Sequence, residues 1–227
     1  MDTQAHQMDL QQPAGIHPIY WFFFDLDQTL LCIDRKNSKE KLSRIQSQHL
    51  SDSEIVDFST KKRILALYAQ ELPPILQILN RSPLVSFNIL TTATYDCSKT
   101  IIPFIEETYL NGGDFKGKTI NRTQVASFLE ETNDHHQKID LYSKGNYIKK
   151  LLHTTNTTYQ NHHVILIDDK ITQRESAKRH NFIVIDPTQP DFIDQLTSLV
   201  SSIAHPDTST SSEPWQPLRR SARIRNK

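Results

Sequence analysis

Apolar residues along the chain fall into short runs, and amphipathic segments separate these runs. Each run is bounded by polar or turn-forming residues, which is typical of buried strands. The predicted strands are residues 19–25, 84–92, 138–143, 162–169 and 181–187. The segments with apolar residues at helical spacing predict helices at 63–72, 73–82, 95–110, 144–153, 171–180 and 191–203. Strands that alternate with helices indicate a parallel sheet covered by helices on both faces.

The fold class that follows is α/β, a Rossmann-like three-layer sandwich with a mainly parallel five-stranded sheet. One core domain is expected over residues 18–204, with insertions or small cap elements at 31–72 and 112–137. The first insertion has helical spacing in places. The second has turn signals and allows a short strand around Ile120. Neither insertion has enough apolar residues for a core of its own, so we expect a small cap and a fairly open site.

The two ends of the chain differ from the core in composition. Residues 1–17 are polar and rich in Gln, and residues 205–227 are rich in Ser, Thr and Pro before a basic end, so both are expected to be disordered. The formal net charge is zero, but residues 218–227 hold five cations and no acid. This tail is a candidate to bind nucleic acid or an acidic surface, and a solvated tail without a function is the alternative.

Cysteine usage and the apolar runs bear on the compartment. Cys32 and Cys97 are too few and too far apart to form a disulfide framework or a metal-ligand motif. No apolar run reaches the ~18 residues that a membrane span needs, and residues 1–17 lack the apolar centre of a secretion signal. A reducing, cytoplasmic location is therefore expected.

Carboxylates directly follow two of the predicted strands. Asp25 and Asp27 come at the end of the first strand, and Asp168 and Asp169 come at the end of the fourth. Parallel sheets carry their chemistry at the carboxyl ends of the strands. If these two strands are neighbours, the acids converge and resist ionising together unless a cation lies between them. Mg²⁺ prefers oxygen ligands, and no His or Cys cluster offers a softer site, so Mg²⁺ is the predicted cofactor.

Two more strand ends supply groups that can bind an anion. Thr91 ends the second strand, and Lys144 opens a helix after the third. Acids, a metal, a lysine and a hydroxyl together indicate a site for a phosphoryl group. One carboxylate there can act as a nucleophile and form an aspartyl-phosphate, and a second carboxylate two residues on can move protons to and from the reacting oxygens.

Four stretches, in this order, resemble the sequence motifs of the haloacid dehalogenase-like (HAD) superfamily. FFFDLDQTL resembles motif I, D-x-D-x-T, and NILTT resembles motif II, an apolar strand that ends in Thr or Ser. SKGNYIKKLL resembles motif III, a lysine at the start of a helix, and VILIDDK resembles motif IV, an apolar strand that ends in paired acids. The resemblance covers roughly residues 19–187, and it implies a phosphatase of the HAD type.

The resemblance implies a role for each acid. Asp25 would be the nucleophile and a metal ligand. Asp27 would be the general acid and base, and its backbone carbonyl would bind the metal. Asp168 would bind Mg²⁺, and Asp169 would help directly or through a water molecule. The dehalogenases of the family lack the second acid of motif I, so Asp27 favours phosphoryl chemistry over halide chemistry.

The resemblance also implies how a phosphoryl group is bound. Lys144 would orient the nucleophile and the phosphate, and Thr91 would bind the phosphoryl group, with Thr92 as the second candidate. Thr29 would brace the loop after the nucleophile. Gln28 departs from the family, because many members have glycine at this position. Glutamine is expected to fit a helical turn there at little cost, although it could narrow access to the site.

Each of these residues, taken singly, has an ordinary structural explanation, such as a helix cap or a solvated side chain. Their joint order favours an active site, and the leading hypothesis is a Mg²⁺-dependent phosphatase acting on phosphomonoesters. The open site favours a macromolecular or exposed phosphate, with a small metabolite as an alternative. Two further hypotheses are a catalytically silent HAD-fold scaffold and a polynucleotide phosphatase assisted by the basic tail. The histidine pairs at 135–136 and 162–163 are interpreted as surface or packing residues.

Overall fold

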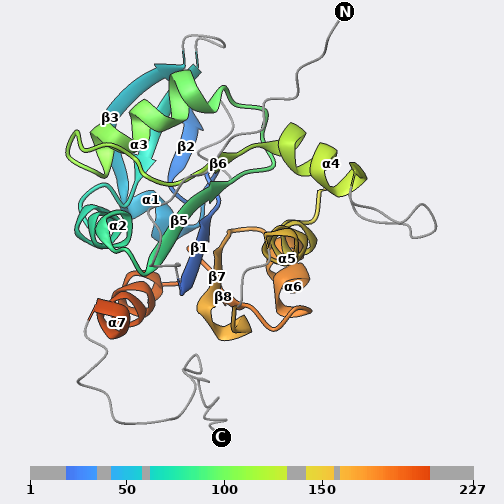
Figure 1. The fold of residues 1–227 in the computed structure, drawn as a ribbon. Coiled ribbons are helices and arrows are strands. Elements are labelled where there is room, and N and C mark those ends of the chain that lie inside the picture. The colour runs from blue at the N-terminus through green and yellow to red at the C-terminus, as the bar shows by residue number, and fades with distance from the viewer. Residues whose placement is uncertain (1–18, 35–41, 58–61, 132–141, 156–158, 205–227) are drawn as a thin grey trace, which may run out of the picture.

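A parallel five-stranded sheet forms the centre of the molecule (Figure 1). The computed structural model describes residues 19–34, 42–57, 62–131, 142–155 and 159–204. The strand order is β6-β5-β1-β7-β8, and every neighbouring pair is parallel. The strands are β1 (Tyr20–Phe24), β5 (Val85–Leu90), β6 (Thr119–Ile120), β7 (Val164–Ile167) and β8 (Ile183–Ile185). The predicted α/β fold is confirmed.

The middle strand β1 separates two apolar clusters, one on each face of the sheet. Phe22 and Phe24 belong to the larger cluster, Phe23 belongs to the smaller one, and all three are fully buried. Burying each such side chain stabilises the fold by about 1.5–3 kcal/mol. The larger cluster is covered by α2 (Leu72–Arg81), α3 (Ile102–Thr108) and α7 (Phe192–Ala204). The smaller one is covered by α4 (Arg122–Glu131), α5 (Lys144–Thr154) and α6 (Ile171–Lys178). The predicted three layers are therefore present.

The first insertion forms a small antiparallel sheet with one short helix. Its strand order is β2-β4-β3, with β2 (Leu31–Asp34), β3 (Leu50–Asp57) and β4 (Lys62–Leu67), and the helix α1 (Arg44–Gln48) lies between β2 and β3 in the chain. We call these four elements the cap. Five described cap residues belong to the same cluster as the apolar residues of α2 and α7: Leu31, Cys32, Ile64, Ala66 and Leu67. Among the described residues, the cap therefore has no separate core, as expected.

The helix predicted over 63–72 is wrong, because its first half is strand β4. Five consecutive residues from Ile64 to Tyr68 are buried, so both faces of β4 are covered. A short apolar run that is buried on both faces cannot be told from a buried helix by its periodicity. The helix predicted over 73–82 is confirmed as α2, which has two prolines in its first turn.

The strand predicted over 138–143 falls mostly outside the described residues. Residues 138–141 lie outside the described part of the chain, and Ser143 is the N-cap of α5 rather than the end of a strand. The edge position beside β5 is taken by β6, the short strand allowed around Ile120. The helices predicted at 144–153, 171–180 and 191–203 correspond to α5, α6 and α7.

Several predictions concern residues outside the described ranges, including residues 1–17, the pair His135–His136 and the basic tail. The second histidine pair is described. The His163 ring lies 4.4 Å from the Tyr20 ring and 4.3 Å from the His162 ring, as a packing role requires. Within the described residues, no helix combines the length and the apolar character needed to cross a membrane.

Candidate active site

The register of the sheet brings the acids of motifs I and IV to neighbouring positions. Phe24 is paired with Ile167, and the Asp25 amide donates to the Ile167 carbonyl at 2.8 Å. Asp168 follows Ile167 directly, so Asp25 and Asp168 leave adjacent strands side by side. The predicted convergence of the acids required the two strands to be neighbours, and β1 pairs with β7.

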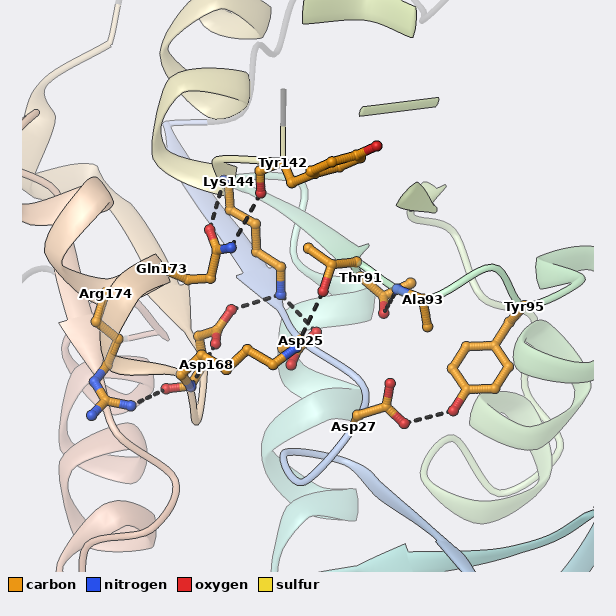
Figure 2. A network of polar contacts seen from close by, with 12 residues as sticks. Asp25, Asp27, Thr91, Ala93, Tyr95, Tyr142, Lys144, Asp168, Gln173 and Arg174 are labelled. Carbon is orange, nitrogen blue, oxygen red and sulfur yellow. Dashed lines mark hydrogen bonds and ion pairs between the residues drawn. The ribbon is translucent and has the colours of Figure 1, made fainter. Parts of the chain in front are cut away.

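Lys144 lies between the two acids (Figure 2). Its Nζ is 2.6 Å from Asp25 Oδ1 and 2.6 Å from Asp168 Oδ2, and all three side chains are at most 1% exposed. The lysine is the first residue of α5, where the Ser143 hydroxyl accepts from the Asn146 amide. The Gln173 side chain accepts from the Lys144 amide at 2.9 Å. The start of α5 is thus fixed so that the ammonium group reaches both strand ends.

Three carboxylates gather around this ammonium group. One oxygen from each of Asp25, Asp168 and Asp169 lies within 4.8 Å of the others. Asp25 Oδ2 and Asp169 Oδ1 are buried, and neither has a hydrogen-bond partner. With all three acids ionised, one buried lysine would leave two negative charges uncompensated. A divalent cation with oxygen ligands would supply the charge and a partner for Asp169 Oδ1, so these residues fit Mg²⁺.

The pKa shifts reflect the same excess of buried acid. Burial lowers the pKa of Lys144, but the charges and hydrogen bonds of Asp168 and Asp25 outweigh it, so that the pKa lies above its usual value. Burial raises the pKa of Asp168, against the attraction of Lys144. Burial, followed by the charges of Asp25 and Asp168, raises the pKa of Asp169 to about 7. A lysine shared between acids cannot hold all of them ionised, which favours binding of a further cation.

Asp27 lies apart from this carboxylate group. Its carboxylate accepts from the Tyr95 hydroxyl, with 2.5 Å between Oδ1 and the phenolic oxygen (Figure 2). The sequence analysis did not find Tyr95, because nothing in the local pattern marks it. The predicted binding of metal by the Asp27 backbone carbonyl stays a prediction.

The loop after Asp25 corrects one expectation. Gln28 has a φ of 61°, in the left-handed region, and not the geometry of a helical turn. A side chain costs about 1–2 kcal/mol in this conformation, so glutamine is not a low-cost replacement for glycine here. The buried Gln46 of α1 donates to the Gln28 carbonyl, and the Gln28 amide donates to the Leu31 carbonyl at 2.7 Å. The buried Thr29 hydroxyl has no hydrogen-bond partner, so it does not brace the loop by a hydrogen bond.

The two threonines of motif II lie at the carboxyl end of β5, beside β1. Thr91 is fully buried, and its hydroxyl accepts from the Ala93 amide at 3.1 Å. Thr92 is partly exposed, and its hydroxyl accepts from Lys170 Nζ at 3.2 Å. Both therefore remain candidates for binding a phosphoryl group.

Arg174 of α6 holds the loop after β7, and the sequence analysis missed it. Its Nη1 donates to the Asp168 carbonyl at 2.7 Å and to the Asp169 carbonyl at 2.5 Å. Its Nη2 forms an ion pair of 2.7 Å with Asp186, which follows β8. The signal that could have found it is its position in the first turn of the helix after motif IV, one turn from the acids.

Comparisons with known sequences give no match. No protein-family model matches the chain, and no curated protein matches it. Some solved structures are similar to it over most of its length. A HAD-superfamily hydrolase of subfamily IA from Geobacter sulfurreducens has 12% identity and a TM-score of 0.45, over 80% of this chain and 96% of that chain.

Two further structures are similar in the same way. A HAD-like family hydrolase from Porphyromonas gingivalis has 13% identity and a TM-score of 0.43, over 81% of this chain and 98% of that one. The N-terminal part of a Bacteroides fragilis protein contains a phosphatase domain complexed with Mg; it has 14% identity and a TM-score of 0.42, over 80% of this chain and 40% of that one. Similarity of this degree does not transfer an activity, so we base the function on the geometry of the site.

Proposed function

We propose that this chain is a HAD-like phosphatase that hydrolyses phosphomonoesters with the help of Mg²⁺ and through an aspartyl-phosphate on Asp25. The observation that carries the proposal is the buried Lys144, which contacts Asp25 and Asp168 while Asp25 Oδ2 and Asp169 Oδ1 have no partner. A buried acid normally finds a hydrogen bond. Unpartnered oxygens beside a fixed ammonium group are those of a site that binds a further charged group.

In the first step of this reaction, a carboxylate oxygen of Asp25 attacks the phosphorus atom of the ester. Lys144 holds Oδ1, so Oδ2 is the oxygen left for attack. As the new bond between Oδ2 and phosphorus forms, the bond from phosphorus to the ester oxygen breaks, and Asp27 gives its proton to that oxygen. In the second step Asp27 takes a proton from water, which attacks phosphorus and releases Asp25 and phosphate.

The remaining groups bind and orient the phosphoryl group. Lys144 neutralises part of its charge. Thr91 keeps a donor for a phosphoryl oxygen, because a hydroxyl that accepts one hydrogen bond can still donate another. Mg²⁺ would be held by Asp25, Asp168 and Asp169, together with the Asp27 carbonyl, and it supplies positive charge that offsets the repulsion between phosphate and carboxylates. The partly exposed Thr92 is the alternative phosphoryl ligand.

The cap favours a phosphate carried on a large or exposed substrate. Its apolar residues pack into the core cluster, so the described part of the cap is not a separate domain that closes over the site. A phosphoprotein, or another exposed phosphomonoester, is the substrate class that we propose, with a small metabolite as the alternative. The basic tail at 218–227 lies outside the described residues, and its proposed binding to nucleic acid stays a prediction.

A phosphate-release screen tests this function. Wild type and Asp25→Asn are compared on phosphopeptides, nucleic-acid ends and small phosphomonoesters, each with Mg²⁺ and with EDTA. We expect Mg²⁺-dependent release by wild type and a loss of at least about 10⁴-fold in Asp25→Asn, because removal of a nucleophile leaves only binding and electrostatic contributions. Equal inactivity of both proteins across the screen would support the scaffold hypothesis instead.

A further inference from the structure

We propose that Tyr95 is a positioning residue for Asp27, and that it fixes which carboxylate oxygen of Asp27 carries the catalytic proton. This inference rests on the proposed function, in which Asp27 is the general acid and base. The contact is between the Tyr95 hydroxyl and Asp27 Oδ1 at 2.5 Å, and it joins residues 68 positions apart in the chain. Figure 2 shows the phenol pointing at the Asp27 carboxylate from the side away from Lys144.

Tyr95 itself is held in place by the packing of its ring and by hydrogen bonds of the chain on either side of it. Its ring is partly buried against the larger apolar cluster. The chain before it is fixed at Ala93, whose amide donates to the Thr91 hydroxyl at 3.1 Å and whose carbonyl accepts from the Arg122 amide at 3.0 Å. The chain after it is fixed by Asp96, whose side chain accepts from the Lys99 amide at 3.1 Å. The phenol is therefore a preorganised donor rather than a mobile surface group.

The direction of this hydrogen bond decides the position of the proton on Asp27. A phenol donates to a carboxylate oxygen, and it also donates to the carbonyl oxygen of a protonated carboxyl group. Oδ1 is thus an acceptor in both protonation states, so the proton that moves resides on Oδ2. In the first step the Oδ2–H bond breaks and an O–H bond to the leaving oxygen forms, as the phosphorus–ester bond breaks. In the second step Oδ2 takes one proton back from the attacking water.

A residue that acts only through the acid has a specific kinetic signature. An ester with a poor leaving group needs its oxygen protonated as the bond breaks, whereas a nitrophenolate leaves with little help. Loss of Tyr95 should therefore slow phenyl phosphate, whose phenol has a pKa of about 10 like the tyrosine side chain, and leave 4-nitrophenyl phosphate nearly unaffected. A general loss of folding or of phosphate binding would slow both esters alike.

The experiment measures kcat/KM for phenyl phosphate divided by kcat/KM for 4-nitrophenyl phosphate, in the full chain with Mg²⁺. In Tyr95→Phe we expect this ratio to fall about tenfold, the effect of one hydrogen bond to an acid catalyst. Tyr68→Phe is the matched control, since it removes a buried hydroxyl that donates to the Pro187 carbonyl at 2.6 Å, away from Asp27. Its ratio should equal that of wild type, even if its Tm falls.

A double-mutant cycle separates positioning from a structural effect. In an Asp27→Asn background, Tyr95→Phe should change the ratio no further; a fall that persists there overturns the proposal. A wild-type ratio in Tyr95→Phe also overturns it, while the proposed function stands. An inactive wild type overturns the proposed function itself.

Crystal structures of wild type and Tyr95→Phe give a readout that does not depend on activity. We expect the Asp27 carboxylate to accept the Tyr95 hydrogen bond in wild type and to take another orientation in Tyr95→Phe. An Asp27 carboxylate with the same orientation in both structures contradicts the positioning role of Tyr95.

Discussion

The two acid-bearing loops, residues 25–31 after β1 and residues 168–170 after β7, are held by different kinds of contact. The second loop is fixed mostly from nearby in the chain, although the distant Lys144 contacts Asp168 at 2.6 Å, as it contacts Asp25. The Lys170 amide donates to the Asp168 carboxylate at 2.8 Å, and Arg174, within the next helical turn, donates to both acidic carbonyls. The first loop depends on partners from three distant elements.

Those partners are Lys144 at the start of α5, Tyr95 after β5 and Gln46 of the cap. Each holds a different part of the loop: one oxygen of the nucleophile, one oxygen of the acid, and the carbonyl of the left-handed Gln28. Most contacts of the second loop are therefore local, whereas the loop with the proposed nucleophile and the proposed acid needs the folded molecule around it. Substitutions far from residues 25–31 in the chain should therefore affect catalysis. Substitutions close to residues 168–170 in the chain should affect cation binding.

Removal of the Lys144 ammonium group should lower stability and activity more than any other substitution discussed below. In Lys144→Met, the buried carboxylates of Asp25 and Asp168 lose their common partner, which typically costs about 3–5 kcal/mol of unfolding free energy. Phosphatase activity should be lost as well. Denaturant unfolding in EDTA measures the effect, and Lys178→Met, which loses an exposed pair with Glu175, is the control with an expected change of about 0–1 kcal/mol. Equal losses in both variants would contradict the central position of Lys144.

Binding of Mg²⁺ should stabilise the protein more at high pH than at low pH. Without metal, burial and two neighbouring acids raise the pKa of Asp169 from 3.8 to about 7. A raised acid pKa favours the folded state below the unfolded pKa, and this contribution is lost as the pH rises towards 7. Mg²⁺ must displace that proton at low pH, whereas at about pH 8 and 100 times its Kd it should add about 2.7 kcal/mol.

The measurement is Tm with Mg²⁺ and with EDTA at about pH 5.5 and about pH 8. The rise in Tm should be the larger at the higher pH. In Asp169→Asn this difference between the two pH values should shrink. An equal rise at both pH values in wild type would contradict the raised pKa of the site.

Arg174→Met should loosen the second loop without touching the first. The guanidinium group holds the carbonyls of Asp168 and Asp169, and loss of such an indirect support typically lowers metal affinity about 10–100-fold. Calorimetric titration with Mg²⁺ measures the change. Arg179→Met, an exposed arginine at the end of the same helix, should bind Mg²⁺ like wild type. Unchanged affinity in Arg174→Met would mean that the loop keeps its shape without the arginine.

Gln28→Gly should give the smallest effect, and a stabilising one. Glycine adopts the φ of 61° without strain, so unfolding should require about 0.5–1 kcal/mol more, after the larger entropy of the unfolded glycine chain is subtracted. The hydrogen bonds of Gln28 use its backbone amide and carbonyl, so the substitution keeps them. Gln28→Ala is the control, because alanine keeps the Cβ atom and should give no gain. A gain in both variants would assign the effect to the side chain and not to φ.

Sequence reasoning found those parts of the site that a local pattern encodes. Asp25, Asp168 and Lys144 each follow or open a regular element, and their convergence follows from the rule that parallel strands carry chemistry at their carboxyl ends. Tyr95 could not be found in this way, since its contact with Asp27 depends on the path of the chain after β5. Gln28 was misjudged because the sign of φ depends on how the loop closes onto Leu31.

The elements of the fold divide in the same way, into those that a local pattern marks and those that depend on contacts with distant parts of the chain. The central strands could be predicted because polar or turn-forming residues bound their short apolar runs, and most helices because their apolar residues recur at helical spacing. Strand β4 could not, since residues buried on both faces carry no periodicity, and only its pairing with β2 and β3 makes it a strand. Strand β6 was only allowed, not assigned, because two residues are too few for a pattern.

The packing of the cap into the larger apolar cluster has a consequence for how the molecule unfolds. Leu31, Ile64 and Leu67 of the cap share one continuous core with residues of α2 and α7. Elements that share a core tend to melt together, so cap and sheet should form a single cooperative unit. A cap that does not move separately from the sheet leaves access to the site unchanged. Substrate selectivity would then come from the shape of the phosphorylated group and not from the closing of a lid.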